Sequence, residues 1–316
     1  MSWFQFSFPD FCYAFISILL EGVPFVLLGT LLSGLIDQFL PAKFLYRILP
    51  KNRGASILVS GLVGLVLPMC ECGIVPVIRR LIRKGLSIPS AVTYMLSAPI
   101  VNPIVAVSTF MAFKGQSALE MTSLRLGLGY LIAVGVGFVV LRLKPETILR
   151  ESALPDAEET DRHSHHEHEH EHEHEHEHAP GLATRLRLAL AAAVTDFLDV
   201  IVFFVLGAMI AATFNTAVDQ TVILPLALDT TLATFALMGL AGILTLCSTS
   251  DAFVAATLTA FPPVAKLAFL VFGPMMDVKL AFIYSALFRK RFVIGLAVAL
   301  FLVIGVVCVR LSFLRL

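Results

Sequence analysis

Residues 67–106, LPMCECGIVPVIRRLIRKGLSIPSAVTYMLSAPIVNPIVA, decide how this chain can fold. The stretch is apolar on both sides, yet it contains Cys70, Glu71, Cys72, Asn102 and five prolines. An interior proline removes a backbone donor and clashes with the preceding helical turn. Backbone groups freed in this way at membrane depth must be buried in protein or line a cavity. The stretch therefore predicts a pair of broken membrane segments around a polar, thiol-bearing site, as in many secondary transporters. The alternative is two kinked helices packed on each other.

The composition is that of a membrane protein. The chain has 316 residues, of which 58% are hydrophobic and only 15% are charged, against about 25% charged in soluble domains. Apolar runs of about 20 residues recur, and each is long enough to cross a bilayer. We expect an all-α polytopic protein of the cell (inner) membrane, surrounded by lipid. The formal net charge of zero gives no reason to expect a nucleic-acid partner, and the N-terminus has no basic segment typical of a cleaved signal peptide.

The positions of basic residues predict the topology. Spans are expected at 11–36, 86–113, 123–143, 188–214, 264–288 and 292–309, with breaks between Ala98 and Pro103 and at 273–277. Short loops rich in Lys and Arg stay cytoplasmic, and both 37–55 and 79–84 are of this kind. Residues 56–78 must then enter and return, as a re-entrant hairpin with Cys70 and Cys72 at its tip.

A polar segment divides the chain into a first membrane half (1–143), a cytoplasmic loop (144–187) and a second membrane half (188–316). Strict alternation of Glu and His in this loop predicts disorder and accessory binding of Zn, Cu or Ni, with a solvated linker as the alternative. All nine histidines of the chain lie there, so an intramembrane HExxH metalloprotease is excluded, and no enzyme is predicted. They are His163, His165, His166, His168, His170, His172, His174, His176 and His178.

The two halves look like a duplication. LLEGVPFVLLGTL (19–31) aligns with FLDVIVFFVLGAM (197–209), which places Glu21 over Asp199. Further along, Cys70 aligns with Cys247. Three spans plus one hairpin in each half would invert the second half relative to the first, a common transporter symmetry. If the hairpins instead cross the membrane, the repeats would be parallel.

The breaks of both halves would then meet near the middle of the membrane. Soft sulfur ligands select Cu(I), Zn and similar ions, and carboxylates could exchange protons in a coupled cycle. The candidate metal ligands are Cys70, Cys72, Cys247, Met69, Met275 and Met276. The candidate coupling residues are Glu21, Asp199, Asn102, Asp277 and Glu71. No nucleotide-binding P-loop occurs, so secondary transport of Cu or Zn is predicted, with no permanently bound cofactor. Cys12 and Cys308 lie in plain apolar runs and are expected only to pack.

The motifs MCECGIVPVIRRL, SAPIVNP, LCSTSD and GPMMD resemble those of the ArsP-type predicted permeases, a bacterial family of multi-span transporters. The His-rich loop is similar to that of a branch regarded as copper and zinc efflux proteins, while another branch exports trivalent organoarsenicals. The resemblance implies export of a thiophilic metal or metalloid ion from the cytoplasm, with Cys70 and Cys72 as ligands. The expected partners are a second copy of this chain or a periplasmic metal-binding protein. The second half has only Cys247 at the matching place, so a symmetric four-thiol site is not expected.

Two other functions stay open at this point. One is a permease for arsenite, an organoarsenical or another solute. The other is a membrane thiol oxidoreductase that passes electrons between Cys70 and Cys247. Thiol exchange needs accessible thiolates, and the negative charge of Glu71 beside the cysteines disfavours them.

Overall fold

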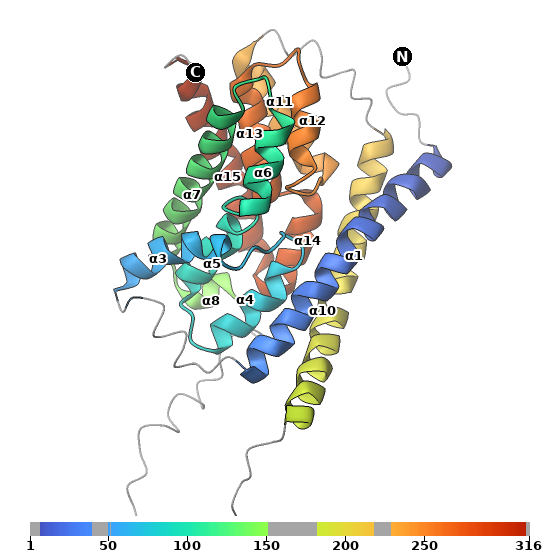
Figure 1. The fold of residues 1–316 in the computed structure, drawn as a ribbon, viewed down its shortest axis with the longest axis vertical. Helices are drawn as coiled ribbons and strands as arrows, with labels where there is room; N and C mark the ends of the chain where they lie inside the picture. The colour runs from blue at the N-terminus through green and yellow to red at the C-terminus, as the bar shows by residue number, and fades with distance from the viewer. Residues whose placement is uncertain (1–6, 40–49, 51, 151–181, 218–228, 314–316) are drawn as a thin grey trace, which may run out of the picture.

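The computed structural model describes residues 7–39, 50, 52–150, 182–217 and 229–313, and the regular elements in them are all helical (Figure 1). Among the described residues, five segments are long and apolar enough to cross a bilayer. They are α1 (Phe8–Phe39), α7 (Ala118–Val140), α10 (Leu182–Ala217), the consecutive pair α13 (Pro263–Met275) and α14 (Val278–Leu287), and α15 (Lys290–Phe313). The expected all-α multi-pass membrane protein is confirmed.

The span expected at 86–113 is broken into α5 (Ile88–Ser97) and α6 (Pro103–Ala112). Each of these two helices begins at a residue whose side chain caps it. Ser87 accepts a hydrogen bond from the Ser90 amide, and Asn102 accepts one from the Ile104 amide. A side chain in this N-cap position satisfies a backbone donor that would otherwise be unpaired. The α13–α14 break is built in the same way, with Asp277 at the start of α14.

The prolines of the central stretch were expected to interrupt helices, but they lie in first helical turns or between helices. Pro76, Pro89 and Pro103 lie in the first turns of α4, α5 and α6, where a missing amide costs nothing. Pro68 and Pro99 lie in the connections between helices. The prolines therefore fix where helices begin, and the breaks are the loops before them.

Two short helix pairs approach the interior from opposite ends of the molecule. The first is α3 (Arg53–Leu62), which continues through η1 (Val63–Leu65), and α4 (Ile74–Arg83); the second is α11 (Thr230–Leu244) and α12 (Asp251–Thr257). In Figure 1, α3 and α4 lie toward the lower end, near the short helix α8 (Pro145–Ile148), while α11 and α12 lie toward the upper end. None of these four helices is long enough to cross a bilayer alone.

The two longest helices, α1 and α10, pack side by side (Figure 1). Glycine permits α1 to approach the central stretch closely, because a Cβ on Gly29 would lie 2.3 Å from the carbonyl oxygen of Gly73. The backbone of α1 therefore rests directly on the residue that follows Cys72.

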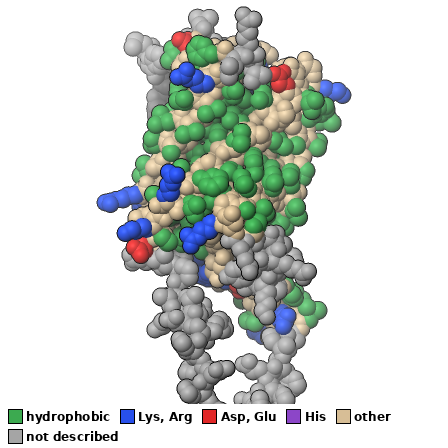
Figure 2. Space-filling model, turned by 90° about the vertical axis from the view of Figure 1, so that its left-hand side faces the viewer, with side chains coloured by type: hydrophobic (Ala, Val, Ile, Leu, Met, Phe, Trp, Pro, Cys, Tyr) green, Lys and Arg blue, Asp and Glu red, His purple; other side chains and the backbone are tan. Residues whose placement is uncertain are grey.

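The surface agrees with a membrane location. Figure 2 shows a broad hydrophobic area on one face, with more of the Lys and Arg side chains of that face in the lower part of the view than near the top. This arrangement matches the enrichment of basic residues on the cytoplasmic side.

The inverted relation of the two halves stays a prediction, and side-specific labelling tests it. Single cysteines introduced at Thr216, at the end of α10, and at Ser164, outside the described residues, are expected to react with a membrane-impermeant maleimide from opposite sides. The charge distribution places 215–231 outside and the His-rich loop inside. Labelling of both positions from the same side would contradict the inverted arrangement.

Candidate functional site

Two non-helical segments, 66–73 and 245–250, meet in the interior of the molecule. Ser248 Oγ donates a hydrogen bond of 3.1 Å to Glu71 Oε2, and both residues are buried. Thr245 ends α11 with φ of 51°, a left-handed conformation that is uncommon for a residue with a Cβ. The loops of the first and second halves are thus in direct contact, at positions that the sequence alignment makes equivalent.

A small cavity lies where these loops face α1 and α14. It is lined by all three cysteines of the broken segments, Cys70, Cys72 and Cys247, and by Glu21 and Glu71. Ile18, Gly22, Phe25 and Lys279 complete the lining. Its volume of about 10 Å³ is close to the least that can hold one water molecule. The structure therefore brings together five of the predicted site residues in a space with room for one small group.

Lys279 is a lining residue that the sequence analysis missed. It is only 4% exposed, and its Nζ donates to the carbonyl oxygen of Thr245 over 3.4 Å. A lysine inside an apolar span is itself a signal of function, because an intramembrane charge is costly. The spacing of Asp277 and Lys279 after a predicted break could have identified this residue.

Glu21 differs from the other lining residues because its side chain is exposed. Among the described residues, it accepts one long hydrogen bond of 3.5 Å from Ser250 Oγ. Glu71, by contrast, is 1% exposed and held by Ser248. Glu21 is therefore the freer carboxylate at the edge of the cavity, and Glu71 is the fixed one.

A buried ion pair supports the second loop from behind, and it also escaped the sequence analysis. Arg125 on α7 is fully buried, and its Nη2 donates to both carboxylate oxygens of Asp251, at 3.0 and 2.7 Å. The same nitrogen donates to the carbonyl oxygen of Ser248 at 2.9 Å, and Nη1 donates to Thr109 Oγ1 at 2.8 Å. Arg125 thus ties α7 of the first half to the loop that carries Cys247.

Asn102 and Asp277 lie at matching breaks, as predicted, but their side chains cap helices. Asn102 Oδ1 accepts from the Ile104 amide at 2.9 Å, and Asp277 Oδ1 accepts from the Leu280 amide. Neither lines the thiol cavity. Asp277 Oδ2 is buried and has no hydrogen-bond partner among the described residues, so this oxygen is the one with remaining bonding capacity.

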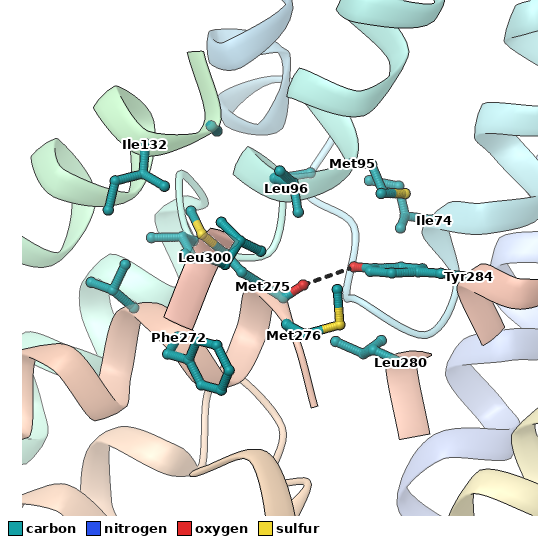
Figure 3. Packing of buried hydrophobic residues seen from close by; sticks show 14 of the residues in the cluster. Ile74, Met95, Leu96, Ile132, Phe272, Met275, Met276, Leu280, Tyr284 and Leu300 are labelled. Carbon is teal, nitrogen blue, oxygen red and sulfur yellow. Dashed lines mark hydrogen bonds between the residues drawn. The ribbon is translucent and has the colours of Figure 1, made fainter. Parts of the chain in front are cut away.

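The methionines lie in hydrophobic packing. Met275 and Met276 are buried beside Phe272, Leu280 and Tyr284 (Figure 3). Met69 belongs to the same buried cluster. None of the three lines the thiol cavity in this conformation, so the structure does not bring the predicted thioethers to the thiols.

Asp199 is also separate from the cavity, although it aligns with Glu21. It pairs with Arg79 of α4 at 2.7 Å, and the side chain of Asp199 is 49% exposed. Together with Asp196 and Arg150 these residues line a second cavity of about 300 Å³, between α4, α10 and α14. Asp196 is more deeply buried and binds Arg80 at 3.0 Å. Asp199 therefore joins α10 to the first hairpin.

A family model described as a predicted permease, ArsP_1, matches residues 7–313. The chain belongs to the ArsP-type predicted permease family. The protein YcgR of Bacillus subtilis, assigned to UPF0718, is 36% identical over 290 residues, which is 92% of each chain. A Streptococcus mutans protein named as a putative two-component membrane permease complex subunit is 33% identical and covers 93% of this chain and 92% of its own. No solved structure matches.

The permease contains no preassembled metal site in the part of its chain that the structure describes, where no three His, Cys, Asp or Glu side chains are grouped as ligands. The thiols line one cavity without forming a ligand set. The histidines of 163–178 lie outside the described residues, so the predicted accessory site stays a prediction.

Proposed function

We propose that this permease exports a thiophilic metal ion of the copper and zinc class from the cytoplasm by secondary transport. The observation that carries the proposal is the convergence of Cys70, Cys72 and Cys247, from both halves of the chain, on one cavity. Thiolate sulfur binds soft and borderline ions much better than it binds Mg²⁺ or Ca²⁺. Because the thiols are not yet grouped as a ligand set, the ion would draw the two loops together as it binds.

The size of the cavity favours a bare ion over a larger solute. About 10 Å³ accommodates an ion that has lost its water, whereas an organoarsenical would require the loops to separate. The arsenical alternative is therefore the weaker one for this conformation.

The charged lining supplies a means of coupling. Glu21 is exposed at the edge of the cavity, where its carboxylate would exchange protons with water outside the cavity. Lys279 provides a fixed positive charge beside Glu71 and the thiols, and a cation must compete with it. A site with this charge pattern favours an ion that thiols hold strongly over one held by charge alone.

We propose that the cytoplasmic route runs through the 300 Å³ cavity beside Arg79 and Asp199. This ion pair is partly exposed, with side-chain exposures of 25% and 49%, and exposed pairs contribute only about 0–1 kcal/mol. Arg80–Asp196, the second pair between α4 and α10, is more deeply buried, with side-chain exposures of 12% and 3%, and would also have to separate if α4 moved. Arg125–Asp251, which holds the second loop, is buried too, and one guanidinium nitrogen bonds both carboxylate oxygens.

The test is growth of a deletion strain, with and without the gene, across Cu, Zn, Cd, Ni, arsenite and methylarsenite. Resistance to Cu or Zn alone is expected, with lower metal accumulation in cells that carry the gene. Resistance confined to the arsenicals would replace the metal by the alternative substrate class. Unchanged growth and accumulation throughout the panel would contradict metal export.

One observation keeps the redox alternative testable: Cys70 and Cys247 line the same cavity. Rapid acid quenching and alkylation of cells distinguishes the two functions. A Cys70–Cys247 disulfide that forms and disappears with the respiratory state would favour electron transfer, whereas thiols that stay reduced during metal export favour transport.

The His-rich loop is expected to be an accessory. Deleting residues 163–178 should leave export at saturating metal nearly intact and weaken the response at low metal, because a chelating tract raises the local ion concentration without forming the pathway. Initial export rates over a range of metal concentrations measure this. A tract in which every His is replaced by Gln is the matched control for length, and complete loss of resistance at normal protein level would contradict the accessory role.

We further propose that the permease works with a second component, since the Streptococcus mutans relative is named as a subunit of a two-component complex. Co-purification from the native membrane, with the gene tagged at its own locus, tests this proposal.

A further inference from the structure

A wide groove lies on the apolar outer side of the molecule, and none of the three thiols of the broken segments lines it. It lies between α7 and α15, both of which pack against α13, and has a volume of about 830 Å³. Its walls are apolar except for Thr147 and Arg291. Glycines at Gly135 and Gly295 widen it, since a Cβ built on either would meet nothing within 4 Å.

The polar end of the groove is basic. Arg291 lines it, and Arg142, Lys144 and Lys290 are exposed nearby, with Glu146 as the one acidic neighbour in the same described segments. Backbone bonds keep these segments together. The Arg289 amide donates to the carbonyl oxygen of Ile148 at 2.9 Å, and the Arg150 amide donates to that of Leu287 at 3.1 Å. This end carries the charges that the sequence assigns to the cytoplasmic face.

The length of the groove distinguishes between occupants. Along α7 its lining runs from Leu128 to Val140, roughly 18 Å at 1.5 Å per residue, and along α15 it runs from Arg291 to Val307, roughly 24 Å. Both walls are shorter than a hydrocarbon core of roughly 30 Å, so the groove does not extend through the whole core. A transmembrane helix of a partner would need a groove through the whole core. An acyl chain that enters from the cytoplasmic leaflet needs no more than this one.

We propose that the α7–α15 groove binds an anionic phospholipid of the cytoplasmic leaflet, with acyl chains along the apolar walls and the phosphate at Arg291. A head group with net negative charge matches the basic end, whereas a zwitterionic one carries its own cation to that end. The proposal uses no residue of the thiol cavity and stands whatever ion the permease carries.

The experiment is native mass spectrometry of the full-length protein in detergent, incubated with phosphatidylglycerol or with phosphatidylcholine of the same chains. Phosphatidylglycerol is expected to be retained preferentially. Arg291→Gln should weaken that retention roughly fivefold, the effect of one basic residue near an anionic head group, and should leave phosphatidylcholine unchanged. Gly295→Leu, which fills the groove, should weaken retention of both lipids.

Two control variants match these changes. Arg310→Gln removes an exposed charge from the opposite end of α15, and Gly127→Leu adds the same bulk at an exposed α7 glycine that does not line the groove. Neither should alter lipid retention. Equal retention of the two lipids, or equal effects of Arg291→Gln and Arg310→Gln, would overturn the proposal. A lipid-free dimer that Gly295→Leu dissociates would also overturn it, because a second copy would then occupy the groove.

Discussion

Replacing both Cys70 and Cys72 by Ser is expected to abolish metal resistance and raise cellular metal to the level of the deletion strain. Serine nearly preserves the size of the side chain, but its hydroxyl is a hard, weakly acidic donor that cannot replace a thiolate for a soft ion. Both residues line the thiol cavity, and Cys72 is buried at its wall. Accumulation of the metal, in cells that express each variant at matched level, measures the effect.

Two cysteines that do not line the thiol cavity, Cys12 and Cys308, supply the controls. Cys12→Ser should retain full export, because Cys12 lies on α1 away from the cavity lining. Cys308 is fully buried, so Cys308→Ala is preferable there, since it removes sulfur without burying a hydroxyl. Cys247→Ser is expected to reduce export as well. Full export by the Cys70→Ser/Cys72→Ser variant would eliminate the thiol site, and with it the reason to name a metal as the substrate.

Arg125→Met is expected to lower the free energy of unfolding by about 3–5 kcal/mol, the typical cost of removing one partner from a buried ion pair. The variant leaves the carboxylate of Asp251 buried without its guanidinium and removes the donor to the carbonyl oxygen of Ser248. Thermal unfolding of the purified protein in detergent, followed by size-exclusion fluorescence, measures the loss. Export should fall with it, because the Cys247 loop loses its support.

The double variant Arg125→Met/Asp251→Leu separates charge from packing. Replacing both partners by apolar residues should restore much of the stability, since no charge is then left unpaired. Arg79→Gln is the matched single change at a partly exposed pair and should cost less than about 1 kcal/mol. A loss for Arg125→Met no larger than that for Arg79→Gln would contradict the supporting role of the buried pair.

The breaks in the membrane spans could be predicted because residues close together in the sequence determine them. Asn102 directly precedes Pro103, and Asp277 follows Pro274 by three residues; the structure begins α6 and α14 directly after these two capping residues. Both signals depend only on near neighbours in the sequence. The first pair of short helices, α3 and α4, is separated by the loop that carries Cys70 and Cys72, and its re-entry on the side of the basic residues stays a prediction.

The convergence of the thiols could also be predicted, since alignment of the halves paired Cys70 with Cys247. Lys279 and the Arg125–Asp251 pair were missed for a different reason. Partners 126 residues apart in the chain share no local pattern, and a charge in an apolar span signals function without naming its partner.

Alignment of the two halves also grouped residues that the structure separates. Two positions can be equivalent in the alignment and still have different neighbours in the folded protein. Glu21 faces the thiol cavity, whereas Asp199 at the matching place binds Arg79 near the basic end of α4. The methionines were assigned by ligand type alone, and Met275 and Met276 instead pack against aromatic and aliphatic side chains. Only the three-dimensional arrangement separates a sulfur that lines a cavity from one that fills a core.

The close approach of Gly29 to Gly73 has a consequence for mutational scanning. Any side chain on Gly29 would meet the Gly73 backbone, and a Cβ on Gly73 would lie 2.7 Å from the carbonyl oxygen of Phe25. Backbone atoms cannot rotate out of the way as a side-chain tip can, so alanine at either position must move a whole helix. In a library that covers every substitution, these two glycines should tolerate as little change as Cys72, although they contribute no ligand. A map of tolerated substitutions would therefore include α1 residues that bind no ion, and the site read from such a map would be larger than the set of residues that could act as ligands.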